Sequence, residues 1–185
     1  SKIDEKMFIV LRCAALRFLC NKYYIIHNNE WIEKQSNKLI QNYIKIVNQT
    51  PRDMKISKNI IPSNLYDTKF ETILKEENFK NAIHHMSYVQ FLTCPIDIWN
   101  VMQNSIVCLM KGTSKLTDLK FYIRNIAFDD FFSIILPVFA SAEIMSPNGL
   151  HSFVSYFMSI PKTNGMDITA ASTIALSEFV HNDLD

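Results

Sequence analysis

The residues best placed for chemistry are two adjacent carboxylates, Asp129 and Asp130, which stand directly before a long apolar run. Carboxylates suit the first turn of a helix, because they accept hydrogen bonds from free backbone N–H groups and meet the positive end of the helix dipole. A helix-capping role is therefore the structural interpretation of this pair, and Asp130 is the better candidate for it.

The other reactive side chains do not form a known catalytic or metal-binding pattern. No G-x-S-x-G elbow, H-E-x-x-H or C-x-x-C pair is present, and neither is a glycine-rich phosphate loop. His84 and His85 are adjacent, so they point to different faces of a helix. We therefore expect no metal, no cofactor and no enzyme of covalent chemistry. The four cysteines are expected to be reduced thiols of the core: Cys13, Cys20, Cys94 and Cys108.

The composition favours helices and excludes several partners. The chain is 48% hydrophobic but has only three glycines and six prolines, fewer than the many turns of an all-β fold consume. The net charge is +1 and no basic run occurs, so we expect no nucleic acid partner. No uncharged apolar run is long enough to cross a bilayer, so we expect no direct membrane insertion.

Helical periodicity and turn residues predict an all-α chain in two parts. Residues 1–66 are expected to form an N-terminal helical hairpin, broken at residues 27–29, followed by a polar linker at residues 51–66. Residues 67–185 are expected to form the main helical domain. Its helix at residues 128–142 is apolar on nearly every face and contains Pro137, so we expect it to be central and kinked. The helix that begins at Pro95 is expected to end near Gly112.

Three blocks of sequence, taken in order, resemble one known family. The block at 82–98 ends in a turn of the Thr-Pro-Arg-Asp-Lys-Leu type, of which Thr93, Pro95 and Asp97 are kept. The block at 129–142 aligns without gaps with a pattern of Asp-Asp, two apolar residues, Pro, three apolar residues and Tyr-Val, in which Ser133 and Pro137 stand in place of the Pro and the Tyr. The block at 175–180 is similar to a closing helix. Together they resemble the VPS-nine domain of Rabex-type guanine-nucleotide exchange factors. This resemblance covers residues 79–180, and residues 1–66 would then match the helical bundle that precedes the domain in some members.

The resemblance implies a function and a partner. Members of the family release nucleotide from Rab-family GTPases of the early-endosomal type, with no cofactor. They insert one aspartate toward the GTPase lysine, the phosphates and Mg²⁺, and by position that aspartate is Asp129. We expect a monomeric, cytoplasmic protein that is recruited peripherally to endosomes. Further residues implied to contact the GTPase are Phe128, Asp130, Phe132, Ser133, Ile168, Thr169 and Ala171.

Four of these positions depart from the family pattern, and at the first of them Phe128 replaces an alanine. Ser133 replaces a proline, while Ile168 and Ala171 fall where the family has its catalytic Tyr and Thr. Neither Ile168 nor Ala171 can donate a side-chain hydrogen bond. The resemblance is therefore also compatible with a Rab-binding or scaffold module that lacks exchange activity. A helical scaffold without any connection to GTPases is the third alternative.

Overall fold

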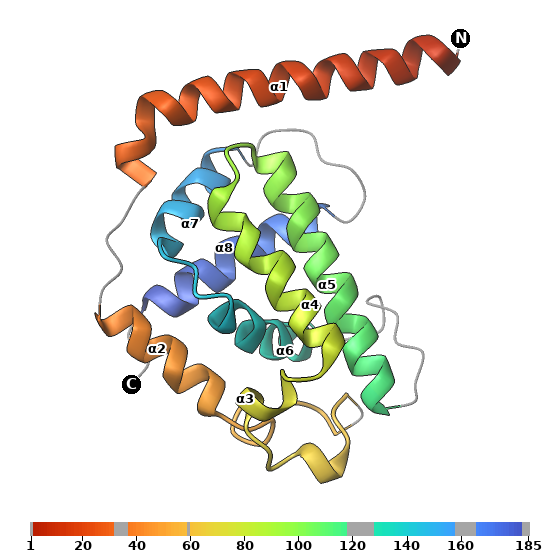
Figure 1. The fold of residues 1–185 in the computed structure, drawn as a ribbon, viewed down its shortest axis with the longest axis vertical. Helices are drawn as coiled ribbons and strands as arrows, with labels where there is room; N and C mark the ends of the chain where they lie inside the picture. The colour runs from red at the N-terminus through yellow and green to blue at the C-terminus, as the bar shows by residue number, and fades with distance from the viewer. Residues whose placement is uncertain (1, 32–36, 59, 118–127, 158–165, 183–185) are drawn as a thin grey trace.

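The computed structural model describes residues 2–31, 37–58, 60–117, 128–157 and 166–182. Its described residues form helices and no strands, which confirms the all-α fold (Figure 1). The α-helices are α1 (Lys2–Trp31), α2 (Asn37–Asn48), α3 (Phe70–Ile73), α4 (Glu77–Ser87), α5 (Pro95–Thr117), α6 (Phe128–Ser141), α7 (Pro147–Tyr156) and α8 (Met166–His181). Two 3-10 helices are η1 (Ser63–Leu65) and η2 (Tyr88–Phe91).

Helix α6 is the central element of the molecule. Every side chain from Ile134 to Ala140 is buried, and α2, α4 and α8 pack around the helix. A helix that is apolar on nearly every face can bury all of its apolar surface only in the interior. The prediction of a central helix is confirmed. Pro137 lies inside α6, as expected.

Each of two helix pairs packs on α6 through one member: α4, which packs along α5, and α8, which packs along α7. Gly112 does not end α5, which continues to Thr117. Its role is close packing, because a Cβ atom added at Gly112 would lie 3.1 Å from ring atoms of the buried Phe79. The expectation of a helix C-cap at Gly112 is therefore wrong.

Residues 51–66 take part in the core, whereas their polar composition predicts a linker. The side chains of Ile56, Ile60 and Ile61 are buried in the same hydrophobic cluster as α6. The hydroxyl of Tyr66 donates to the carbonyl of Ile56 at 2.8 Å, which closes the segment into compact turns. The main core thus contains residues from both predicted parts of the chain, since Tyr43 of α2 also donates to the carbonyl of Ile144, at 2.7 Å.

Helix α1 departs most from expectation. It continues through residues 27–29, where a break was expected, and it does not pair with α2 as an antiparallel hairpin. Figure 1 shows α1 lying across one end of the molecule, near α7, while α2 packs on α6 and α8. Asparagine and histidine cost a helix interior only about 0.5 kcal/mol each, which is too little to stop a helix held by tertiary contacts.

The second half of α1 contacts the body of the molecule. Arg17 forms a bidentate ion pair with Asp97 of α5, with a shortest N–O distance of 2.6 Å. Tyr23 stacks on Tyr156 of α7 at a ring-centre distance of 5.1 Å, and Cys20 is buried. None of the helices among the described residues is both long enough and apolar enough to cross a membrane.

Candidate functional site

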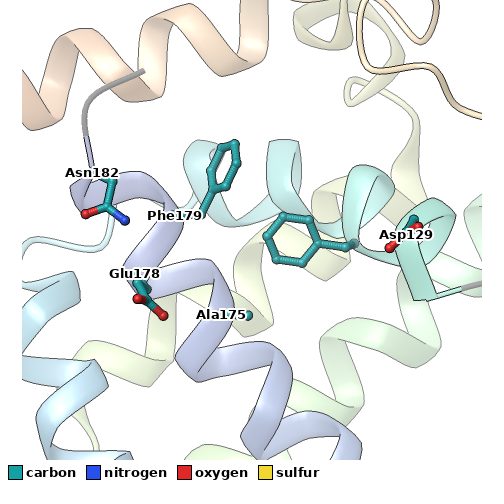
Figure 2. A pocket seen from close by; sticks show the side chains of 6 residues that line it. Asp129, Ala175, Glu178, Phe179 and Asn182 are labelled. Carbon is teal, nitrogen blue, oxygen red and sulfur yellow. The ribbon is translucent and has the colours of Figure 1, made fainter. Parts of the chain in front are cut away.

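An open groove of about 340 Å³ lies between α6 and α8. Its lining residues are Asp129 and Phe132 of α6, Ala175, Glu178 and Phe179 of α8, and Asn182 just beyond α8. Figure 2 shows Asp129 at one side of this groove and Asn182 at the other, with Phe179 between them. The rings of Phe132 and Phe179 meet edge to face with their centres 5.6 Å apart. The groove therefore has an aromatic base and polar sides.

Asp129 stands in the first turn of α6 with its side chain exposed to solvent. The carboxylate makes no hydrogen bond or ion pair with any other residue that the structure describes. Asp129 is thus a charged acceptor, held by a buried helix and open to a partner.

Asp130, its neighbour, is used inside the fold. Its side chain is half-buried and accepts a hydrogen bond from the backbone N–H of Ser57 at 3.0 Å. Asp130 thereby joins the start of α6 to residues 51–66. Because one carboxylate oxygen is taken by this bond, Asp130 has a structural role, and its expected contact with a GTPase stays a prediction.

The residues of α8 that were implied by the resemblance divide into two groups. Ile168 and Ala171 are exposed, and with Ala175 and Glu178 they recur every three or four residues, so they form one ridge of α8 that leads into the groove. Thr169 is only 2% exposed, and its carbonyl accepts the hydroxyl of Thr173 at 2.7 Å. Thr169 is therefore not on the exposed ridge, and its expected contact with a GTPase stays a prediction.

The remaining implied positions belong to α6. Phe132 lines the groove and is half-buried, so part of its ring is covered by the protein and part is exposed to solvent. Ser133 is half-buried but is not part of the groove lining. The side chain of Phe128 lies outside the described residues.

Sequence reasoning missed Ala175, Glu178, Phe179 and Asn182 as residues of the site. The three- and four-residue spacing that continues from Ile168 and Ala171 along α8 is the signal that predicts them. Glu178 adds a second exposed carboxylate, and the lining contains no cationic side chain among the described residues. The groove is thus complementary to a partner that presents basic and apolar side chains together.

Within the described part of the chain, no group of three or more histidine, cysteine, aspartate or glutamate residues is arranged to hold a metal ion. Comparisons of the chain with protein-family models, with curated proteins and with solved structures gave no match.

Proposed function

We propose that this chain is a guanine-nucleotide exchange factor for Rab-family GTPases of the endosomal pathway, and that Asp129 is the group that enters the nucleotide site. One observation carries the proposal: the Asp129 carboxylate is exposed and unpaired within the described chain, at the start of a buried helix. A group with these properties can reach into a docked protein without disrupting its own fold.

The physical basis is electrostatic. A small GTPase holds its nucleotide with backbone amides, a lysine and Mg²⁺. A carboxylate placed near that lysine competes with the phosphates for it and repels their negative charge. Two unit charges at 4 Å interact by about 4 kcal/mol at an effective dielectric constant of 20. Since each 1.4 kcal/mol is about a factor of ten in rate, this interaction alone supplies on the order of a thousandfold acceleration of nucleotide release.

The groove beside Asp129 provides the docking surface in this proposal. Phe132 and Phe179 offer an apolar base, and the exposed side chains of Ile168 and Ala171 extend it along α8. Aromatic and aliphatic contacts of this kind anchor protein interfaces, while charges at their edges set orientation. Glu178 supplies such an edge charge on the α8 side of the groove.

The test is release of a fluorescent GDP analogue from a panel of Rab GTPases, with the chain added in excess. Wild type should accelerate release from at least one endosomal Rab, and Asp129→Asn should reduce the rate constant by about a hundredfold or more. Glu77→Gln is the matched control, because Glu77 is also an exposed carboxylate in a first helical turn but lies on α4. Equal rates for wild type and Asp129→Asn would reject the role of Asp129.

A second candidate function is binding of a Rab GTPase without exchange. It is favoured by Ile168 and Ala171, which are exposed at the α8 ridge but have no hydrogen-bond donor, and by the burial of Thr169, which cannot replace them. Under this alternative a Rab is retained in a pull-down while its nucleotide release is unchanged. The double substitution Ile168→Tyr with Ala171→Thr should then confer or raise exchange, since it returns donors to the edge of the groove.

A further inference from the structure

The outward face of α1 is an apolar surface that the described part of the chain leaves uncovered. Eight large hydrophobic side chains there are each between 57% and 72% exposed: Met7, Phe8, Val10, Leu11, Phe18, Leu19, Ile25 and Ile26. The side of α1 that faces the body is marked by Cys20, which is buried, and by Tyr23 and Tyr24, which pack against α7. Contiguous apolar surfaces of this size mark sites of association.

The spacing on this face is that of a helix-pairing seam. The residues nearest its centre are separated alternately by three and four positions: Phe8, Leu11, Ala15, Phe18, Lys22 and Ile25. This alternation keeps one stripe of an α-helix facing a second helix along its whole length. The seam covers 18 residues, or about 27 Å of helix. The partner expected on this face is therefore another helix.

The seam is complementary to itself when a second copy runs in the opposite direction. Phe8 then faces Ile25 of the second copy, and the small Ala15 faces the bulky Phe18 of the second copy. Pairing of large with small side chains lets two helices interdigitate without voids. A two-fold axis at the middle of the seam generates every one of these pairs twice, as a closed dimer requires.

Charge selects the antiparallel direction. In a parallel pair, Lys22 of each copy would face the other, and like charges in direct opposition are destabilising. In the antiparallel pair Lys22 faces Leu11 of the second copy, and the two lysines are about 16 Å apart along the axis. The ammonium of Lys22 lies 5.7 Å from the centre of the Phe18 ring, so its aliphatic part already lies along the seam. It can cover Leu11 while the charge stays in water.

The available area is sufficient for a stable dimer. Four of the eight exposed side chains lie in the seam and four flank it. At on the order of 100 Å² each they offer an upper limit of roughly 800 Å² per copy, which reaches the area of a standard specific interface. From the seam, its self-complementarity and this area we propose that the chain forms a homodimer through antiparallel pairing of two α1 helices. This proposal differs from the monomer expected from the sequence.

The first test is the molar mass in solution by analytical ultracentrifugation of the full chain. Wild type should sediment as a dimer, and Phe18→Glu should shift it to a monomer, because the new carboxylate would be buried opposite Ala15 of the second copy. Ile44→Glu is the matched control, since Ile44 is also an exposed apolar residue of a helix but lies on α2. Circular dichroism confirms that each variant is folded. A monomeric wild type, or equal masses for the two variants, overturns the proposal.

The second test determines the direction of pairing. Phe8→Cys and Ile25→Cys chains are mixed and oxidised with glutathione disulfide, which is reduced as the intermolecular disulfide forms. Antiparallel pairing gives a mixed disulfide between the two variants, and neither variant cross-links efficiently to itself. A homodisulfide of Phe8→Cys alone would indicate parallel helices and overturn the proposed arrangement. Binding of a monomeric chain to anionic phospholipid vesicles, lost in Phe18→Glu, would instead assign this face to a membrane surface and also overturn it.

Discussion

The two adjacent aspartates of α6 offer a sharp separation of structural and functional roles. We expect Asp130→Ala to destabilise the fold and Asp129→Ala to leave the stability unchanged. Asp130 accepts the N–H of Ser57 at 3.0 Å in a half-buried setting, and this bond holds the segment that carries the buried Ile56 and Ile60. Asp129 is exposed, and the structure describes no partner for its side chain.

The expected loss of stability in Asp130→Ala follows from the hydrogen bond between Asp130 and Ser57. Hydrogen bonds to a charged acceptor contribute about 1.5–3 kcal/mol, and loss of the acceptor also leaves the Ser57 N–H without its partner. Because Asp130 is only half-buried, water partly replaces the carboxylate, and a loss near the lower end, about 1.5–2 kcal/mol, is expected for Asp130→Ala. Asp129→Ala should stay within about 0.5 kcal/mol of wild type, as surface substitutions usually do.

The assay is equilibrium unfolding in urea, followed by circular dichroism. The midpoint for Asp130→Ala should fall while the slope m stays constant, because the surface exposed on unfolding is unchanged. If Asp129→Ala lost as much stability as Asp130→Ala, the distinction between the two carboxylates would be wrong.

Two further predictions concern the packing of α4 and α5. Gly112→Ala should destabilise the fold by about 1 kcal/mol, although alanine is the better helix former, because its Cβ would press on the Phe79 ring at 3.1 Å; Phe79→Leu should abolish this penalty, as a double-mutant cycle in urea would show. Glu76 caps α4 by accepting the N–H of Asn78 at 2.8 Å and also pairs with Lys115. Burial opposes its ionisation, but these hydrogen bonds outweigh burial and lower the pKa of Glu76. The stabilisation is therefore present above the usual glutamate pKa of about 4.3 and is lost as the pH falls through the lower pKa of the folded state. Glu76→Ala should cost about 1–2 kcal/mol near neutral pH, and the difference from wild type should shrink in strong acid. The same substitution at the exposed Glu71 is the control. A stability difference between Glu76→Ala and wild type that stayed constant across pH would contradict the capping role of the Glu76 carboxylate.

Periodicity predicts the helices whose inner and outer faces differ, and it predicts the central place of α6, because a helix without a polar face has no position except the interior. Periodicity does not predict the position of α1, whose apolar side chains are exposed. Residues such as Phe8, Phe18 and Leu19 predict burial, but apolar character alone does not say whether the covering surface belongs to the same chain or to another.

The remaining differences come from tertiary contacts that local sequence does not encode. The polar residues 51–66 contain isoleucines that are buried by α6 and its neighbours, and Gly112 is required by the distant Phe79 ring. At the candidate site, Asp129 and Asp130 are chemically identical neighbours. The position of Ser57, 73 residues earlier in the chain than Asp130, determines which of the two carboxylates accepts a hydrogen bond within the fold.

The buried Cys20 makes the attachment of α1 directly measurable. Burial, together with the nearby Cys94 thiol, raises the pKa of Cys20 to about 12, so the closed molecule presents almost no reactive thiolate there at neutral pH. Cys20 is therefore alkylated only when α1 separates from the body, and the labelling rate reports how often this opening occurs. The alkylation rate of Cys20 is thus a direct measure of how often the first helix detaches from the body.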